Sequence, residues 1–535
     1  MMPQRSAWLA WAGIAVLYAV LRVPLLDVPL DRDEGAFGVV AQGMWRGEMP
    51  YRDLADHKPP GIFLIYALAV AVFPPTAMGL HLFLALWNFG TLLPVAALAR
   101  RWSGSEAAGW WAGAAFAYLS ATPAVQGFTC SSEMLMLLPI CGSLWCADAA
   151  VEQAGGGRIW RLLASGALGA AACWIKQPAA FSVAPALGLL MCCGGAERKD
   201  GLRACGWWLA GGVVFSALLL APFVAAGVVA DLWYWSFAHN LNYGGLASSG
   251  LGRKIWERFV QLAPGLGPAL LIGVPGCIWR ARQGGRPRAW MGPACVAGSI
   301  LGAFISPHLY QHYFAQLLPA FAVAAGIGCA ALPAIYAAWP RTVQIVAAIL
   351  LVLPGALAHP SYWFANPAAI SVRRLGPHGF EAGPMVARYL KDRTRPEDAI
   401  FIYGSEPQVA FQAERPLANP FVMLYPLTFP FPRQREFQER AWRELERRTP
   451  AYILVQINNS RSTLVTPATD PWFGTQLNGL VQSSYELESV LLMHPQRGYK
   501  FVTGLSADEL NQVRDFTHFL MFRRKNLPAT TSGAP

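Results

Sequence analysis

The chain has 535 residues, of which 54% are hydrophobic and only 14% are charged. Because soluble globular proteins carry about 25% charged residues, this composition excludes a soluble protein, and the predominance of apolar residues excludes a disordered one. The sequence therefore predicts a polytopic membrane protein, whose net charge of +11 reflects basic loops that fix topology rather than binding to nucleic acid.

Apolar runs of a length that can cross about 30 Å of hydrocarbon recur along the first two thirds of the chain. We expect about eleven membrane-spanning helices, at residues 7–26, 79–99, 106–121, 133–149, 162–175, 178–193, 204–228, 263–279, 290–306, 313–333 and 342–357. The run at 61–73 is not counted, because it is short and lies between Pro59-Pro60 and Pro74-Pro75. Runs of that length are typical of interfacial or re-entrant helices, so we expect a juxtamembrane helix there.

Basic residues support this choice of spans. With the N-terminus inside and 61–73 outside the bilayer, the inner loops contain most of the basic clusters, namely Arg100-Arg101, Arg158 with Arg161, Arg198-Lys199 with Arg203, Arg280 to Arg288, and Arg341. This is the positive-inside pattern. It predicts an integral protein of the cytoplasmic membrane with a cytoplasmic N-terminus and, because the number of spans is odd, an extracytoplasmic C-terminus.

The composition changes from about His359 onward. Charges become frequent, and apolar runs shrink to the length of strands at 399–403, 451–457 and 516–522, with helix-like stretches at 383–393 and 433–448. We therefore expect a transmembrane domain over 1–357, a soluble extracytoplasmic α/β domain over 358–525, and a disordered tail over 526–535.

The segment from Asp27 to Pro60, here named the first outer loop, concentrates acids and bases beside the membrane. It contains Asp31-Arg32-Asp33-Glu34-Gly35, then Gly47 to Asp53, then Asp56-His57-Lys58-Pro59-Pro60. In a structural interpretation Asp33 caps an interfacial helix with Glu34 in its first turn, and Lys58 snorkels before a helix that a proline starts. In a functional interpretation a carboxylate base at the bilayer surface faces a lysine that holds a phosphate.

These residues resemble the GT-C glycosyltransferases, and more narrowly the bacterial relatives of the protein O-mannosyltransferases and of the aminoarabinose-lipid A transferases. The resemblance lies in an Asp-Glu pair just after the first span, a Gly-x-x-Pro-Tyr-x-Asp segment, and a Lys-Pro-Pro that opens a juxtamembrane helix. It covers roughly residues 1–357, with weaker matches at 169–178 and 312–319. It implies a GT-C-like fold and a hexosyl- or pentosyltransferase of the cell envelope, mannosyltransferase-like, that uses a polyprenyl-phosphate sugar.

Site residues follow from the resemblance by position. It implies that Asp33 is the catalytic base, that Glu34 is the second acid of its pair, and that Lys58 contacts the donor phosphate. This chain departs from the aminoarabinose transferases at Phe37, where they have a tyrosine, and at His57, where they have a glutamate. Those departures leave the sugar and the acceptor open, so that protein hydroxyls, lipid A, a cell-wall glycan and another lipid all stay candidates.

The chemistry of such a donor fits residues at the membrane surface. Asp33 would take a proton from an acceptor hydroxyl as it attacks the anomeric carbon, and the anomeric centre would be inverted. The leaving lipid phosphate needs fixed cations, of which Lys58 is the first candidate and Arg253 and Lys254 are the next. Contact with lipid headgroups explains Arg253 and Lys254 equally well. The scheme requires no metal, and dependence on a divalent cation stays open.

Other polar residues near the outer mouths of the spans are candidates for substrate binding, namely His57, Glu133, Lys176, His312 and Tyr313. Each also has a structural alternative. Glu133 would cap its helix, Lys176 would form a structural ion pair, and His312 would be a packed histidine with satisfied hydrogen bonds.

Two other functions compete with glycosyl transfer: a transporter or flippase of lipid-linked sugars, and a non-catalytic membrane assembly protein. A transporter would spread charges through its spans and repeat broken helices in two halves, whereas the charges here concentrate in one outer loop. The expected partners are a polyprenyl-phosphate sugar donor, a lipid, glycan or protein acceptor, and membrane lipids, with no nucleic acid.

Overall fold

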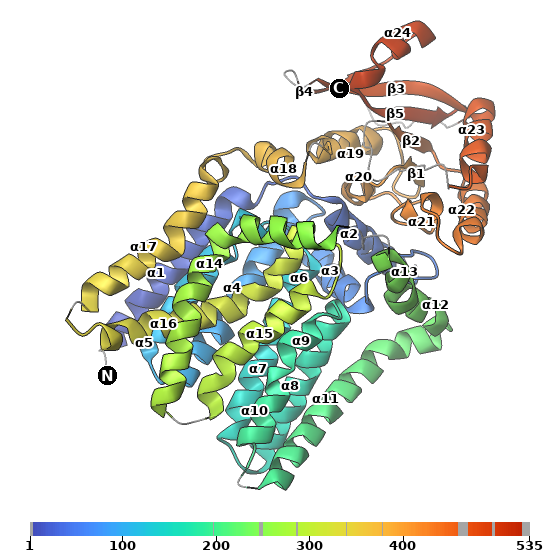
Figure 1. Ribbon diagram of the computed structural model, residues 1–535. Coiled ribbons are helices and arrows are strands. Elements are labelled where there is room, and N and C mark those ends of the chain that lie inside the picture. The colour runs from blue at the N-terminus through green and yellow to red at the C-terminus, as the bar shows by residue number, and fades with distance from the viewer. Residues whose placement is uncertain are drawn as a thin grey trace.

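The computed structural model describes residues 4–195, 197–245, 250–284, 287–338, 340–376, 378–457, 469–494 and 498–526. A bundle of long helices occupies one end of the molecule and a small domain with a β-sheet the other (Figure 1). The predicted architecture, a polytopic helical protein with a C-terminal α/β domain, is confirmed.

Each predicted span corresponds to one helix or to two consecutive helices. They are α1 (Gln4–Arg22), α4 (Ala77–Ser103), α5 (Glu106–Leu119), α6 and α7 (Ser132–Leu135, Leu137–Val151), α8 (Gly155–Ile175), α9 and α10 (Ala179–Val183, Pro185–Cys193), α11 (Arg198–Ala225), α14 (Leu251–Gly284), α15 (Met291–Phe304), α16 (Leu318–Ile335) and α17 (Pro340–Ala358). In the described ranges seven helical segments, rather than the expected eleven, are long and apolar enough to cross a membrane on their own. The run at 61–73 forms the separate short helix α3 (Pro60–Val72).

The predicted inner loops meet at the end of the bundle away from the sheet domain. Arg101, near the end of α4, contacts Glu152 at 2.8 Å, and Arg288, just before α15, contacts the same carboxylate at 2.6 Å. Both arginines also pair with the buried Asp148 of α7. Figure 1 shows the N-terminus at this end too. The charge pattern predicts this grouping, and which side of the membrane the group faces stays a prediction.

The C-terminal domain contains a five-stranded mixed sheet in the order β1-β2-β5-β3-β4. The predicted strands are β1 (Ile400–Tyr403), β2 (Tyr452–Gln456) and β5 (Thr517–Arg524), and β1 pairs with β2 in parallel while β5 is antiparallel to its neighbours. The hairpin β3 (Tyr485–His494) and β4 (Gly498–Val502) is not among the predicted strands. Its edge strand β4 has no buried residue and lacks an apolar run, whereas β3 contains one at 490–493. Residues 527–535 of the predicted tail lie outside the described residues.

Helices complete this domain. The predicted helical stretches are α19 (Gly383–Lys391) and α22 (Gln434–Arg448), and the other helices are α18 (Pro367–Leu375), α20 (Pro407–Ala413), α21 (Tyr425–Thr428), α23 (Trp472–Ser484) and α24 (Ala507–Gln512). The remaining helices precede α14 in the chain, namely α2 (Arg32–Trp45), α12 (Val229–Trp233), a π-helical turn (Tyr234–Ala238) and α13 (His239–Gly245).

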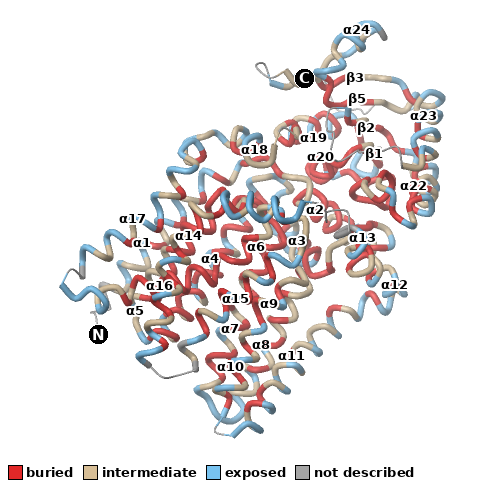
Figure 2. The backbone as a smooth tube through the Cα atoms, in the orientation of Figure 1, coloured by how far each residue is buried: buried red, intermediate tan, exposed pale blue. Residues whose placement is uncertain are grey.

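The first outer loop is held between the bundle and the C-terminal domain. A Cβ atom on Gly35 of α2 would lie 2.1 Å from the backbone nitrogen of Gln408 in α20, so only glycine permits this approach. The backbone N–H of Ala55 donates to the carbonyl oxygen of Pro420 at 2.6 Å. Figure 2 shows buried residues in both α2 and α20, where the two domains meet. The C-terminal domain is therefore packed against the most charged part of the membrane domain.

Candidate active site

Two adjoining cavities lie where the first outer loop meets the C-terminal domain. The first, here named the polar cavity, has a volume of about 870 Å³ and is lined by Asp31, Asp33 and Lys58, among others. The second, here named the lipid-side cavity, has a volume of about 690 Å³. Both are lined by His57, Lys58, His308 and Tyr313, so the two spaces meet at these side chains.

The start of α2 places Asp33 in the polar cavity. The side chain of Asp31 accepts a hydrogen bond from the backbone N–H of Glu34 at 2.9 Å, and the Glu34 carboxylate accepts one from the backbone N–H of Asp31 at 2.9 Å. This capping box makes Asp31 the N-cap, so the structural interpretation in which Asp33 caps the helix is wrong. Asp33 instead lines the cavity.

Glu34 lies on the other side of the same helical turn and is buried in the core. Its Oε1 accepts a hydrogen bond from the backbone N–H of Cys130 at 2.6 Å and lies 2.9 Å from Nε2 of His81. Glu34 lines neither of the two cavities, whereas Asp33 does. The structure therefore separates the two acids: Asp33 faces the cavity, and Glu34 anchors α2 to the helices behind it.

Lys58 lies at the junction of the two cavities. Its Nζ is 3.9 Å from Oδ2 of Asp33 and 2.9 Å from Nε2 of His57. Its backbone is fixed on both sides, because its N–H donates to Oδ1 of Asp56 and its carbonyl oxygen accepts from the hydroxyl of Tyr51. The lysine is therefore held in one place rather than snorkelling freely.

Electrostatics keep Lys58 charged. Burial disfavours the ammonium, but the carboxylates of Asp33, Asp56 and Glu133 outweigh burial and raise the pKa of Lys58 above its ordinary value. The neighbouring His57 behaves in the opposite way, because burial and then the charge of Lys58 lower the pKa of His57 well below its ordinary value. The site thus contains a charged lysine beside a neutral imidazole at neutral pH.

The other predicted binding residues come together around Glu133. The ammonium of Lys176 forms a hydrogen bond with Oε1 of Glu133 and lies 3.8 Å from the ring centre of Tyr313. Nε2 of His312 is 3.9 Å from the same carboxylate oxygen. Glu133 and Lys176 line the lipid-side cavity, and His312 lines the polar one. The ion pair expected as the structural alternative for Lys176 therefore forms at the wall of the cavity itself.

Arg253 and Lys254 lie elsewhere. The Arg253 side chain is 80% exposed and pairs with Glu257 on the outside of α14, and neither basic residue lines either of these cavities. Arg258, one turn beyond Lys254 on α14, lines the polar cavity, and its Nε donates to the carbonyl oxygen of Leu309 at 2.6 Å. The structure thus does not bring the predicted pair to the site, and Arg258 is the basic residue of this helix that reaches it.

Sequence reasoning also missed residues from distant segments. The guanidinium groups of Arg32 and Arg374 line the polar cavity, as does the phenol of Tyr425 from α21 of the C-terminal domain. Among the described residues, no carboxylate forms an ion pair with Arg32, Arg258 or Arg374. The position of Arg32 in the charged first outer loop could have indicated a site residue. Arg374 and Tyr425 belong to no recognisable motif.

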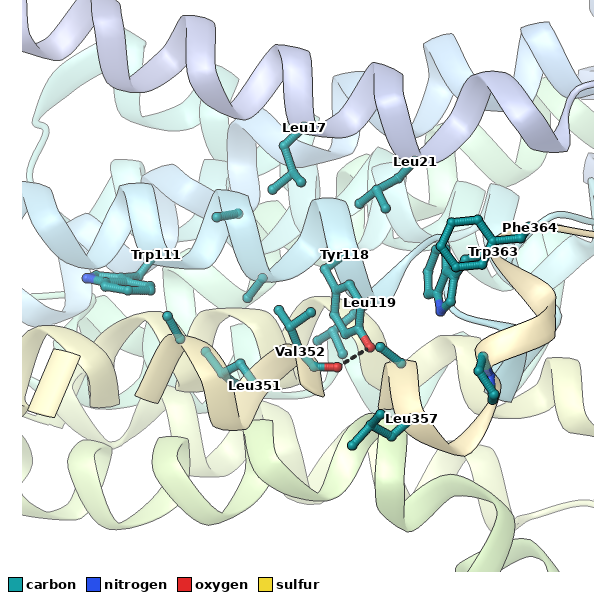
Figure 3. A pocket seen from close by; sticks show the side chains of 15 residues that line it. Leu17, Leu21, Trp111, Tyr118, Leu119, Leu351, Val352, Leu357, Trp363 and Phe364 are labelled. Atoms are coloured by element: carbon teal, nitrogen blue, oxygen red, sulfur yellow. Dashed lines mark hydrogen bonds between the residues drawn. The ribbon is translucent and has the colours of Figure 1, made fainter. Parts of the chain in front are cut away.

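A third cavity of about 580 Å³ is lined almost entirely by apolar side chains of α1, α5 and α17 and of the segment that follows α17 (Figure 3). Its one titratable side chain, Tyr118, donates its hydroxyl proton to the carbonyl oxygen of Val352. This cavity offers no carboxylate, imidazole or cation, whereas the polar cavity and the lipid-side cavity are lined by all three kinds of group. In the described part of the chain, no group of three His, Cys, Asp or Glu side chains is arranged to hold a metal ion.

Solved structures of ArnT and AglB have a similar fold. ArnT from Cupriavidus metallidurans bound to undecaprenyl phosphate matches with a TM-score of 0.57 and 15% identity, over 93% of this chain and 98% of that one. ArnT in the apo state matches with a TM-score of 0.57 and 14% identity, over 94% and 100% of the two chains. The archaeal oligosaccharyltransferase AglB from Archaeoglobus fulgidus, in complex with an inhibitory peptide and a dolichol-phosphate, matches with a TM-score of 0.53 and 11% identity, over 93% and 74%.

A scan against protein-family models gives no match, and a search of curated proteins gives none. The structural matches cover nearly the whole chain, including both the helical bundle and the C-terminal domain. The chain therefore has the GT-C fold, as the resemblance of its first outer loop implies.

Proposed function

We propose that this protein is an inverting glycosyltransferase that moves a sugar from a polyprenyl-phosphate donor to a hydroxyl or phosphate acceptor on the outer side of the cytoplasmic membrane. One observation carries the proposal: a polar cavity and a lipid-side cavity meet at Lys58, whose Nζ lies 3.9 Å from the carboxylate of Asp33. A polyprenyl-phosphate sugar has the same two-part character, with an isoprenoid chain on one side of its phosphate and a sugar on the other.

The rim of the lipid-side cavity suits the isoprenoid chain. Trp233, Leu241 and Ile305 line it, and they are 62%, 81% and 56% exposed. Large apolar side chains that stay exposed around a cavity favour contact with lipid rather than with water. ArnT and AglB share this fold and have been solved with undecaprenyl phosphate and with a dolichol-phosphate, which supports a donor of the same class.

The phosphate of the donor would lie at the junction of the cavities. Lys58 presents its ammonium there, and Lys176 presents a second one that Glu133 holds in place. As the bond between the anomeric carbon and the phosphate oxygen breaks, the phosphate takes the bonding electron pair and gains negative charge. Fixed cations in a partly desolvated site stabilise that charge in the transition state.

The sugar and the acceptor would meet in the polar cavity. Asp33 lines this space and would accept the proton of the acceptor hydroxyl as its oxygen attacks the anomeric carbon from the face opposite the phosphate. One displacement of this kind inverts the anomeric centre. Arg32, Arg258 and Arg374 line the same space, and we expect them to bind anionic groups of the substrates.

Membrane placement follows from the same arrangement. The charge pattern of the loops favours a cytoplasmic location for the end of the bundle that contains Asp148 and Glu152. The cavities and the C-terminal domain would then face the extracytoplasmic side. This is the side on which a lipid-linked sugar is used once its head group has been flipped.

The test is sugar transfer by the full chain in vesicles. Purified protein is given defined polyprenyl-phosphate hexoses and pentoses together with cell-envelope acceptors, and released polyprenyl phosphate and labelled product are measured. We expect donor cleavage that requires an acceptor, its loss in Asp33→Asn, and its retention in Asp27→Asn, which changes an exposed carboxylate of the same loop. Movement of intact lipid-linked sugar across the vesicle without cleavage, or full transfer by Asp33→Asn, would overturn the proposal.

A further inference from the structure

His57 connects the two domains at the centre of the candidate site. Its ring is partly buried between the loop and the C-terminal domain, with Nε2 2.9 Å from Nζ of Lys58 and Nδ1 2.8 Å from the hydroxyl oxygen of Tyr425. Its carbonyl oxygen accepts a hydrogen bond from Nδ2 of Asn240 at 2.9 Å. The imidazole is therefore in contact with both Lys58 and α21.

The partners of the ring determine where its proton lies. A lysine ammonium has three donors and no acceptor, so Nε2 of His57 must accept the hydrogen bond from Lys58. A neutral imidazole carries a single proton, which then lies on Nδ1 and is donated to the hydroxyl oxygen of Tyr425. The ring is neutral because burial and the charge of Lys58 lower the pKa of His57.

We propose that Tyr425 is a positioning residue for Lys58, acting through His57: by accepting the Nδ1 proton it holds the tautomer that anchors the Lys58 ammonium at the junction of the two cavities. The inference rests on the proposed function for the identity of the group that Lys58 binds. It gives the C-terminal domain a part in donor binding, since Tyr425 lies at the start of α21.

Loss of the phenolic oxygen has a defined consequence. Without it, either the Nδ1 proton is left with the more distant carboxylate of Asp56, whose Oδ1 lies 3.8 Å from Nδ1, or the proton moves to Nε2, where it faces the ammonium of Lys58. In the second case the ammonium loses its anchor and the donor phosphate loses a fixed cation. The change affects binding of a phosphate more than binding of an apolar chain.

The substitution Tyr425→Phe isolates this effect. The ring of Tyr425 packs edge-on against His57 at 5.8 Å between centroids, and it also lies against His239 at 5.7 Å and Phe431 at 6.0 Å. Phenylalanine keeps these contacts and removes only the hydroxyl. Tyr485→Phe is the matched control, because it removes a buried hydroxyl of the same domain that donates to the carbonyl oxygen of Pro450 at 2.7 Å.

The experiment measures binding of undecaprenyl phosphate and of undecaprenol, which lacks the phosphate, to the full chain. We expect Tyr425→Phe to weaken binding of undecaprenyl phosphate about tenfold and to leave binding of undecaprenol unchanged. In a Lys58→Ala background the same substitution should cause no further loss, because the group through which it acts is gone. Tyr485→Phe should bind both lipids as the wild type does.

His57→Gln tests the link from its other side. A glutamine amide oxygen accepts from Lys58 without needing a tautomer, so Tyr425→Phe should have little effect in that background. Equal binding of undecaprenyl phosphate by wild type and Tyr425→Phe, or losses from Tyr425→Phe and Lys58→Ala that add in full, would overturn this inference. Failure of the wild type to bind undecaprenyl phosphate at all would instead overturn the proposed function.

Discussion

The molecule has two dense groups of charge at opposite ends of its helical bundle, and they are built differently. At one end, Asp148 and Glu152 pair with Arg101 and Arg288, and Asp148 is fully buried. At the other end, Lys58 lies 3.9 Å from Asp33, a looser pair than those contacts, and both groups line a cavity. The first group closes on itself, whereas the second leaves room for a third partner.

This difference identifies which charges are available for chemistry. A paired and buried network uses its charges to hold helices together, and removal of one member leaves the other buried without a partner. A carboxylate and an ammonium that face a common cavity can exchange protons or contacts with a bound molecule. In a membrane protein, charge density therefore indicates a site only where the charges border a cavity.

The largest effect is expected from Asp33→Asn. If Asp33 is the base, its removal should reduce the rate of sugar transfer about 10²–10⁴-fold while donor affinity stays within a factor of about three. Transfer kinetics and binding of undecaprenyl phosphate, measured on the same preparation, check both parts. A transfer rate within tenfold of the wild type would remove Asp33 from the chemistry.

Asp148→Asn at the opposite end should show the converse pattern. It breaks a buried cluster of two arginines and the indole N–H of Trp102, so we expect the free energy of unfolding to fall by about 3–5 kcal/mol. Donor affinity should be unchanged in the folded fraction. Thermal unfolding in detergent, compared with lipid binding below the transition, separates the two. A selective loss of donor binding would contradict the contrast between the two ends.

Lys58→Ala should weaken binding of undecaprenyl phosphate about 10- to 100-fold, because a hydrogen bond to a charged group contributes about 1.5–3 kcal/mol. The exposed Lys199, which pairs with Glu197 near the opposite end, provides the matched control Lys199→Ala. Equal affinities of the two variants would show that the phosphate does not bind at Lys58.

Gly35→Ala tests the contact that seats the C-terminal domain on α2. A methyl group there would collide with the backbone of Gln408, so we expect a loss of about 1–3 kcal/mol in the free energy of unfolding, together with reduced transfer. Gly13→Ala in α1 is the control, because a Cβ at that position meets no atom within 4 Å. If both alanine variants unfold at the same temperature, the close approach of α20 to α2 does not exist in solution.

The smallest effect is expected from alkaline pH. The carboxylates of Asp33 and Asp56 raise the pKa of Lys58 despite its burial, so its charge persists at every pH below that raised value. The affinity difference between the wild type and Lys58→Ala should therefore stay constant from about pH 8, where the phosphate is fully ionised, to about pH 10, near the ordinary lysine value. The difference is measured because burial lowers the pKa of Lys176, whose charge also contributes to the affinity of both proteins. A difference that disappears with a midpoint below about pH 9 would mean that these carboxylates do not stabilise the Lys58 ammonium.

Much of the fold could be predicted because its signals are local. The apolar runs predict the helices, and the basic loops predict which helix ends lie together. The short run at 61–73 forms the separate helix α3. The strand β4 was not predicted because it is an edge strand with no buried residue, so its residues need not be apolar. The strand β3 does contain an apolar run, at 490–493, which is not among the predicted strands.

The site was predictable only in part, for a geometric reason. Neighbouring residues of a helix point about 100° apart, so the adjacent acids Asp33 and Glu34 face a cavity and the core, respectively. No sequence pattern separates those roles. Tyr425 and Arg374 reach the cavity through tertiary folding across more than 300 residues from Asp33, a distance over which one sequence offers no signal.

A structure of the full chain with bound undecaprenyl phosphate tests the central claim most directly. The proposed function predicts the phosphate within hydrogen-bond distance of Nζ of Lys58 and the isoprenoid chain leaving past Trp233 and Leu241. A phosphate bound at the exposed Arg253, or a chain lying in the apolar cavity between α1, α5 and α17 with its phosphate far from Asp33, would contradict it.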